Sequence, residues 1–132
     1  MKKLENKTAV ITGGAGSIGK ATAALFLEEG AKVLLIDLDE EALKQTAAEL
    51  GNENISWCAA DVSNTDDVKR YANEAKKNFG SVDIFFNNAG IEGVVKPVTD
   101  YPEDEFDKVM AVNVKGVWSG MSRLWPMVEA SF

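Results

Sequence analysis

The chain has 132 residues, a formal net charge of −7, no histidine and a single cysteine, Cys58. This composition excludes histidine-based catalysis, a histidine or cysteine-cluster metal site and a disulfide framework, and it argues against nucleic acid as the main partner, because phosphate binding needs clustered Lys and Arg. No signal-like apolar stretch follows the charged start, and no run reaches the ~18 apolar residues of a membrane span. We therefore expect a cytoplasmic protein with no metal and no membrane partner.

Short apolar runs alternate with segments of helical periodicity. The runs KTAVIT, KVLLID, ISWCAAD and VDIFFNN predict strands over residues 7–12, 32–37, 55–61 and 82–88. They are continuously apolar, which is typical of a parallel sheet covered by helices on both faces. With right-handed crossovers, the sequence predicts an α/β fold with a doubly wound parallel sheet of four strands in the order 3-2-1-4.

The segments between the strands predict helices with one apolar face. The first helix, over residues 18–29, is expected to bury Ile18, Thr22, Leu25 and Phe26. Asp39 is expected to cap the second helix, which Gly51 would end.

A third helix is expected to begin at a capping box formed by Ser63 and Asp66. Its inner face would consist of Val68, Tyr71, Ala72, Ala75 and Phe79. Residues 91–100 are predicted to form a loop. Pro102 suits the first turn of a last helix, which is expected to run, with a possible break, from residue 103 to about residue 125.

The stretch VITGGAGSIG, residues 10–19, places four glycines where the first strand turns into the first helix. Around Gly16, backbone N–H groups can approach a pyrophosphate at the helix N-terminus, and Gly19 lets the helix pack closely on the strand. A lone G-x-G-x-x-G is weak evidence, but Asp37 follows Gly19 by close to the ~20 residues expected for a ribose-binding acid. The alternative role for Asp37, a helix cap, is already filled by Asp39. We therefore predict a single dinucleotide-binding domain over residues 1–132.

Asp37 also favours one dinucleotide over the other. A 2′-phosphate placed ~4 Å from a carboxylate costs about 1–4 kcal/mol per unit charge at effective dielectric constants of about 80 to 20, or roughly tenfold to several-hundredfold in affinity. No Lys or Arg lies in the glycine loop or directly after Asp37 to offset this repulsion. The sequence predicts NAD rather than NADP as the cofactor.

Several motifs together resemble the short-chain dehydrogenase/reductase family over essentially the whole chain. They are TGGAGSIG at residues 12–19, Asp37, the pair Asp61-Val62, NNAG at residues 87–90, and Asn113 within VNVKG. NNAG is the most specific of them. The glycine spacing fits the epimerase-like branch of the family as well, and Ser17 stands where the single-domain branch often has glycine, but NNAG favours the single-domain branch.

The resemblance implies a role for each matching position. Ser17, Ile18 and Gly19 would lie beside the pyrophosphate, Asp37 would hold the adenosine ribose, and Asp61 and Val62 would meet the adenine edge. The implied cofactor-binding set is Gly13, Gly16, Ser17, Ile18, Gly19, Asp37, Leu38, Asp61, Val62, Asn88, Ala89 and Gly90. Asn113 resembles the family's active-site asparagine, which supports the catalytic lysine through water. The alternative is a polar residue that merely breaks the helix.

The family transfers a hydride between NAD(H) and an alcohol or carbonyl, using a serine and a tyrosine whose pKa is lowered by a lysine four residues later. Here Ala75 follows Tyr71 and Glu105 follows Tyr101 at that spacing. We therefore expect a truncated oxidoreductase that holds the cofactor half and is inactive alone. The alternatives are a stand-alone nucleotide-binding or interaction module without catalytic activity and, more distantly, a Rossmann-like methyltransferase, against which NNAG and Asp61-Val62 speak.

Two surfaces predict that the chain forms a homo-oligomer. The fourth strand would be an exposed apolar edge, because the family's fifth strand is absent from this sequence. The last helix carries Trp118, Met121, Trp125 and Val128 along one side. In the family this helix contributes to the subunit interface, and the alternative is that this side packs as core against the sheet.

Overall fold

The computed structural model describes residues 1–130, so the last two residues of the expected domain lie outside the described part. Its sheet has four parallel strands in the order β3-β2-β1-β4, which confirms the predicted topology. The strands are β1 (Thr8–Thr12), β2 (Lys32–Asp37), β3 (Ile55–Ala59) and β4 (Ile84–Phe86). The crossovers between them are α1 (Ser17–Glu28), α2 (Glu40–Leu50) and α3 (Thr65–Phe79).

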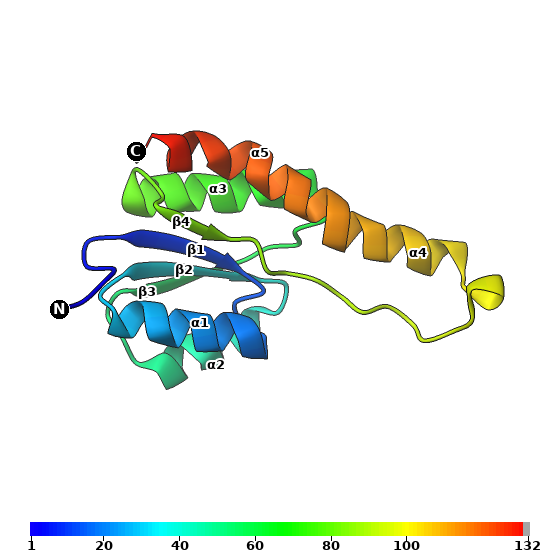
Figure 1. Ribbon diagram of the computed structural model, residues 1–132, viewed down its shortest axis with the longest axis horizontal. Helices are drawn as coiled ribbons and strands as arrows, with labels where there is room; N and C mark the ends of the chain where they lie inside the picture. The colour runs from blue at the N-terminus through cyan, green and yellow to red at the C-terminus, as the bar shows by residue number, and fades with distance from the viewer. Residues whose placement is uncertain (131–132) are drawn as a thin grey trace.

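Helices cover both faces of the sheet, with α1 and α2 on one side and α3 and α5 (Gly116–Glu129) on the other (Figure 1). Successive side chains of a strand point to opposite faces. In β1, Ala9 and Ile11 therefore join the core cluster under α1 and α2, whereas Val10 joins the cluster under α3 and α5. This double burial explains why the strands are continuously apolar in sequence.

Three strands are shorter than predicted, because residues at their predicted ends belong to the adjoining loops. β3 stops at Ala59, and the N–H of Ala60 donates to the carbonyl of Asp37 at 2.8 Å as the chain leaves the sheet. β4 spans only three residues, and Asp83 before it instead accepts the N–H of Thr8 on its carboxylate at 2.9 Å. β1 begins at Thr8 rather than at residue 7.

The predicted buried face of α1 is wrong in part: Phe26 is partly buried against the core, as predicted, but the other three residues are not core residues. Ile18 and Leu25 are 64% and 55% exposed, and the hydroxyl of Thr22 donates to the carbonyl of Ile18 at 2.8 Å. The buried residues are instead Gly19, Ala23 and Leu27. The reason is close packing, since a Cβ on Gly19 would lie 2.2 Å from the carbonyl oxygen of Gly13, so only small residues fit in the first turns.

The helix caps follow the sequence in part. Asp39 caps α2 by accepting the N–H of Ala42 at 3.1 Å, as predicted. The capping box at the start of α3 is wrong, because the side chain of Asn64 accepts the N–H of Asp67 at 3.0 Å. The hydroxyl of Ser63 does not cap the helix and instead donates to the carboxylate of Asp61 at 2.6 Å. The inner face of α3 is confirmed, with Val68, Tyr71, Ala72 and Ala75 buried and Phe79 packed against them.

The chain after β4 forms a long helical arm. The loop leads through a 3₁₀ turn, η1 (Val98–Asp100), into α4 (Glu103–Met110), with Pro102 just before the helix rather than in its first turn. The predicted break is a π-helical segment, η2 (Ala111–Lys115), from which α5 continues. In Figure 1, α4 extends beyond the end of the sheet. No helix in residues 1–130 has the length and apolarity needed to cross a bilayer.

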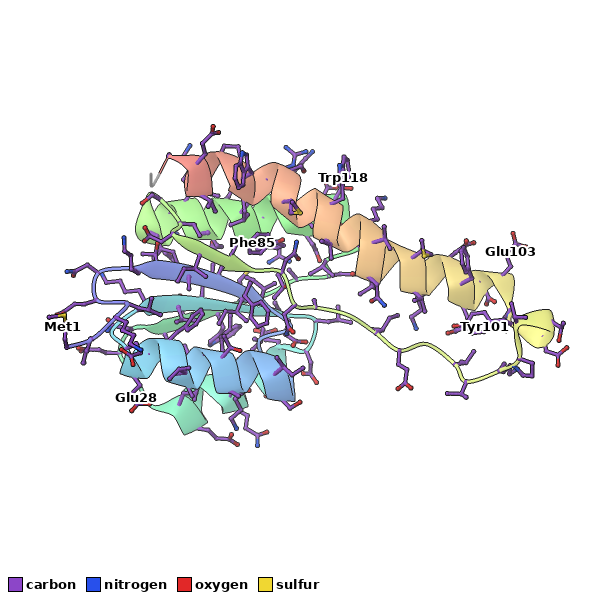
Figure 2. The ribbon with its side chains drawn as sticks, in the orientation of Figure 1. Met1, Glu28, Phe85, Tyr101, Glu103 and Trp118 are labelled. Carbon is purple, nitrogen blue, oxygen red and sulfur yellow. The ribbon has the colours of Figure 1, made fainter. Side chains whose placement is uncertain are left out.

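One side of this arm is apolar and exposed. We call it the apolar stripe; its side chains recur every three or four residues, are 40–66% exposed, and are Phe106, Met110, Val114, Trp118, Met121 and Trp125. Figure 2 shows Trp118 on the outer side of the arm, whereas Phe85 lies beneath it on the sheet. Trp118, Met121 and Trp125 therefore do not pack as core, and of the four residues predicted to share this side only Val128 packs against the core.

Candidate functional site

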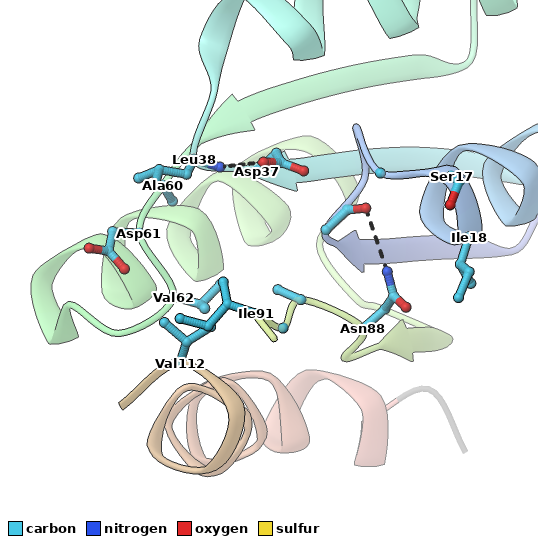
Figure 3. A pocket seen from close by; sticks show the side chains of 14 residues that line it. Ser17, Ile18, Asp37, Leu38, Ala60, Asp61, Val62, Asn88, Ile91 and Val112 are labelled. Atoms are coloured by element: carbon cyan, nitrogen blue, oxygen red, sulfur yellow. Dashed lines mark hydrogen bonds between the residues drawn. The ribbon is translucent and has the colours of Figure 1, made fainter. Parts of the chain in front are cut away.

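A cleft of about 340 Å³ lies at the carboxyl ends of the strands (Figure 3). The chain leaves β1 and β2 toward one face of the sheet, where α1 and α2 lie, and leaves β4 toward the other face, where α5 lies. Because β1 and β4 are neighbours, the switch point lies between them, and ligands of open α/β sheets bind at such a point. Every residue of the predicted cofactor-binding set except Gly19 lines the cleft. The lining is Gly13, Gly16, Ser17, Ile18, Asp37, Leu38, Ala60, Asp61, Val62, Asn88, Ala89, Gly90, Ile91 and Val112.

The N-terminus of α1 opens into this cleft. Gly16 precedes the helix in extended conformation, no side chain caps the helix, and its first turn contains no acidic residue. The first N–H groups of an α-helix have no acceptor within the helix, and the helix dipole favours an anion there. Because Gly16, Ser17 and Ile18 are exposed, these donors can bind a phosphate group from solvent.

Glycine is needed at two positions behind this anion site. Gly13 has a φ of +66°, and a Cβ on it would lie 2.8 Å from the side-chain nitrogen of Asn88. Gly19 does not line the cleft but forms its back, where its missing side chain admits the carbonyl of Gly13. A side chain at either position would therefore overlap neighbouring protein atoms and distort the loop that forms the anion site.

Asp37 lies at the end of β2, beside the glycine loop. Its Oδ2 accepts the N–H of Ala15 at 3.0 Å, and its Oδ1 accepts the N–H of Leu38 at 2.8 Å. The Leu38 side chain next to it is 72% exposed at the mouth of the cleft. A fixed carboxylate at this position suits a ligand with paired hydroxyl groups, because each of its oxygens keeps a free lone pair.

The opposite wall of the cleft is more apolar. Val62 is buried, and Figure 3 places it near Ile91 and Val112 from the arm. Asp61 points from the same wall, and its Oδ1 accepts both the N–H and the hydroxyl of Ser63. The apolar side chains and the carboxylate edge together can receive a flat heterocycle with polar edges.

Three lining residues lie outside the predicted cofactor-binding set: Ala60, Ile91 and Val112. Each lies directly beside a predicted position, since Ala60 precedes Asp61, Ile91 follows Gly90 and Val112 precedes Asn113. Extending each motif by one residue would have found them. Their apolar character carries no motif signal of its own.

Thr12 joins the two loops of the site and was also missed as a site residue. Its side chain is fully buried, and its hydroxyl oxygen accepts the N–H groups of Asn88 and Ala89 at 2.9 and 3.0 Å. The side chain of Asn88 donates in return to the carbonyls of Thr12 and Gly13 at 3.1 and 3.5 Å. NNAG is thus tied to the glycine loop by the first residue of TGGAGSIG.

Asn113, the predicted catalytic residue, does not line the cleft. It lies in η2, where its side chain accepts the N–H of Ile91 and donates to the carbonyl of Ile91, both at 2.8 Å. It therefore holds the segment that follows Gly90 against the arm. A contact with a catalytic lysine stays a prediction.

Neither tyrosine lines the cleft in the described part of the chain. Tyr71 is fully buried between α3 and α5, where burial raises the pKa of its hydroxyl above the ordinary value. Tyr101 lies at the far end of the arm, just before α4, where its hydroxyl approaches Gly93. Residues 1–130 thus supply binding groups to the cleft but no tyrosine acid or base.

The parallel sheet and the cleft at its switch point define a Rossmann-like protein. A family model described as short chain dehydrogenase matches residues 7–131, so the chain belongs to the short-chain dehydrogenase family. An uncharacterized oxidoreductase of Bacillus subtilis, YxbG, is 40% identical over 131 residues, which cover 97% of this chain and 48% of that protein.

Two solved structures with bound dinucleotides are also similar. A 3-ketoacyl-(acyl-carrier-protein) reductase from Brucella melitensis, complexed with NADH, superposes with a TM-score of 0.93 at 36% identity, covering 98% of this chain and 53% of that one. An NAD⁺-bound xylitol dehydrogenase superposes with a TM-score of 0.92 at 34% identity, covering 98% of this chain and 51% of that one. The chain thus spans about half the length of the relatives it matches.

Proposed function

We propose that this chain, as one dinucleotide-binding domain, binds NAD(H) in the cleft and forms the cofactor half of an oxidoreductase acting on an alcohol or carbonyl. The observation that carries the proposal is the placement of an uncapped helix N-terminus and the Asp37 carboxylate in one cleft. The solved relatives complexed with NADH and NAD⁺ support it. When bound, the nicotinamide supplies the site that accepts or gives the hydride.

Each wall of the cleft has a proposed role. The N–H groups at Ser17 and Ile18 hold the pyrophosphate, and Asp37 accepts the hydroxyls of the adenosine ribose. The adenine lies between Val62 and Leu38, with its edge at Asp61. Asn88, Ala89 and Gly90 border the path toward the nicotinamide.

A calorimetric titration of the 132-residue chain with NAD, and in parallel with NADP, tests this proposal. We expect saturable binding of NAD and binding of NADP weaker by at least about tenfold, because the 2′-phosphate would meet Asp37. Circular dichroism establishes that the titrated sample is folded. A folded sample that binds neither dinucleotide would contradict the proposal.

We further propose that the chain alone does not transfer hydride. The supporting observation is that both tyrosines lie away from the cleft, and it equally favours the second candidate, a nucleotide-binding or interaction module without catalysis. The coding sequence beyond residue 132 discriminates the two. A continued reading frame with Tyr-x-x-x-Lys supports the oxidoreductase, whereas a stop codon with a folded product supports the module.

We also infer that the chain forms a homo-oligomer. The apolar stripe supports this inference more strongly than the outer edge of β4, which pairs with no strand among the described residues, because β4 is only three residues long and its side chains are half-buried. The stripe consists of six large apolar side chains along one helical arm. Single exposed apolar residues are normal on a monomer, whereas a continuous apolar patch of this kind marks an interaction site.

A further inference from the structure

The geometry points to Asp37 as the residue that holds the glycine loop in its phosphate-binding shape, in addition to its proposed contact with the ribose. This inference rests on the proposed function only for its consequence for the cofactor. The contacts that carry it lie within the chain itself.

The glycine loop is attached to the end of β2 by two successive bonds. In the parallel pairing of β1 with β2, Thr12 lies opposite Ile36. The N–H of Gly14 then donates to the carbonyl of Ile36 at 2.9 Å, and the N–H of Ala15 donates to the side chain of Asp37 at 3.0 Å. Beyond Ala15, the N–H of Gly16 turns back to the carbonyl of Gly13 at 3.1 Å, which closes the loop.

The second bond must come from a side chain. The backbone carbonyl of Asp37 faces the other neighbouring strand, where it accepts the N–H of Ala60 at 2.8 Å. No backbone acceptor of β2 therefore remains for Ala15, and the carboxylate takes its place. Since Ala15 is partly buried, loss of this acceptor would leave its N–H poorly paired.

The carboxylate is itself fixed before any ligand binds. Its other oxygen accepts the exposed N–H of Leu38 at 2.8 Å, so the two donors together set its orientation. Each oxygen keeps one lone pair for a ribose hydroxyl. Loop shape and dinucleotide choice thus depend on one side chain, and removing that side chain to admit a 2′-phosphate would also loosen the loop that binds the pyrophosphate.

Amide hydrogen exchange of Ala15, followed by NMR without cofactor, tests the anchoring role. We compare the wild type with Asp37→Ala and Asp37→Asn, and use Asp39→Ala as the matched control that removes a neighbouring carboxylate. The N–H of Val33, bonded to the carbonyl of Asn54 at 2.9 Å, reports global stability in each variant.

Relative to Val33, we expect exchange at Ala15 to accelerate about tenfold or more in Asp37→Ala. Asp37→Asn should exchange close to the wild type, because its carboxamide oxygen can face Ala15 while the exposed N–H of Leu38 turns to water. Asp39→Ala should also match the wild type. Unchanged exchange in Asp37→Ala, or equally fast exchange in Asp37→Ala and Asp37→Asn, would overturn the inference.

NADP titrations of the same variants test the consequence for the cofactor. We expect Asp37→Asn to bind NADP at least about tenfold more tightly than Asp37→Ala, since both remove the charge but only Asn keeps the anchor. Equal affinities would overturn the link between loop shape and dinucleotide choice. If the wild type binds no dinucleotide, the proposed function fails, and the exchange of Ala15 in the cofactor-free chain still decides the anchoring role.

Discussion

At the scale of single residues, Thr12 shows how one buried hydroxyl can organise a site. Its oxygen accepts two N–H groups from NNAG, and both donors lie in a loop that lines the cleft. A hydroxyl oxygen has two lone pairs, and Thr12 uses both for these donors. The position of the two loops relative to each other therefore depends on this atom.

Replacing Thr12 by Val removes the hydroxyl and keeps the side-chain shape. We expect the free energy of unfolding to fall by about 1–3 kcal/mol, because the N–H of Ala89 loses its acceptor and the N–H of Asn88 keeps only its bond to the carbonyl of Phe86, at 3.0 Å. Urea unfolding measures this change, and a NAD titration should show weaker binding. Thr12→Ser, which keeps the hydroxyl, is the control. A Val variant as stable as the Ser variant would argue against the role given to Thr12.

Tyr71 predicts a particular pH dependence of stability. Burial raises the pKa of its hydroxyl in the folded chain, so the folded state keeps the proton that the unfolded state releases. The contribution is fully present below the ordinary tyrosine pKa of about 10 and is lost as the pH rises above it. We expect the wild type to lose more stability than Tyr71→Phe between pH 8 and about 11. Urea unfolding of both proteins across this range checks the prediction, and parallel pH curves would contradict it.

At the scale of elements, α5 approaches α3 and the sheet through a glycine. A Cβ on Gly120 would lie 2.7 Å from the hydroxyl oxygen of Tyr71 and 2.9 Å from the ring of Phe85. The hydroxyl of Tyr71 is buried without a hydrogen-bond partner among the described residues. Close contact at this crossing is thus achieved at the cost of an unpaired polar atom.

A double-mutant cycle tests this crossing. Although Ala favours a helix over Gly by about 1 kcal/mol, we expect Gly120→Ala to lower the free energy of unfolding by about 1–3 kcal/mol, because the overlap with two fixed side chains outweighs helix propensity. Tyr71→Phe removes the closest contact, so the double variant should lose less stability than the sum of the single variants. Ser122→Ala, at an exposed position of α5, controls for composition. Strict additivity would show that Gly120 and Tyr71 do not compete for space.

The elements also show what the sequence can predict. The inner face of α3 was predicted correctly because polar and charged side chains occupy the remaining positions, so its apolar residues mark one side. The face of α1 was predicted wrongly in part because its apolar residues surround the helix. Phe26 packs against the core as predicted, but closeness to the glycine loop selects small residues over Ile18 and Leu25. The cap of α3 was predicted at the wrong residue because Ser63 and Asn64 are both favourable N-cap residues. The hydroxyl of Ser63 donates to the carboxylate of Asp61, and the side chain of Asn64 caps the helix.

At the scale of the whole molecule, the site is assembled from segments far apart in the chain. Asp37, Asp61 and the last three residues of NNAG line one cleft, as the motifs predict, because strand ends in a parallel sheet meet at one edge; their contact with a cofactor stays a prediction. The contribution of Val112 was not predictable in this way, since it depends on how the arm lies over the sheet. Asn113 fixes that position by binding the backbone of Ile91, a contact between residues 22 positions apart.

The arm carries the last prediction, which concerns assembly. Its apolar stripe is centred on Trp118, which is 66% exposed, and burial of such a ring against another surface is worth several times the energy of a surface ion pair. We expect the 132-residue chain to sediment as an oligomer at micromolar concentration and Trp118→Glu to shift it toward the monomer by at least about tenfold in dissociation constant, because association would bury the new charge.

Analytical ultracentrifugation over a dilution series measures this shift. Asn73→Glu, which adds the same charge at an exposed position of α3 that is not part of the stripe, should leave the association unchanged. Circular dichroism should be the same for both variants, since neither position is buried in the described part of the chain. A wild-type chain that stays monomeric, or an Asn73→Glu variant that dissociates as strongly as Trp118→Glu, would contradict an interface at the stripe. An oligomer that survives Trp118→Glu intact would instead point to the outer edge of β4, where pairing depends on backbone groups and is insensitive to a charge on α5.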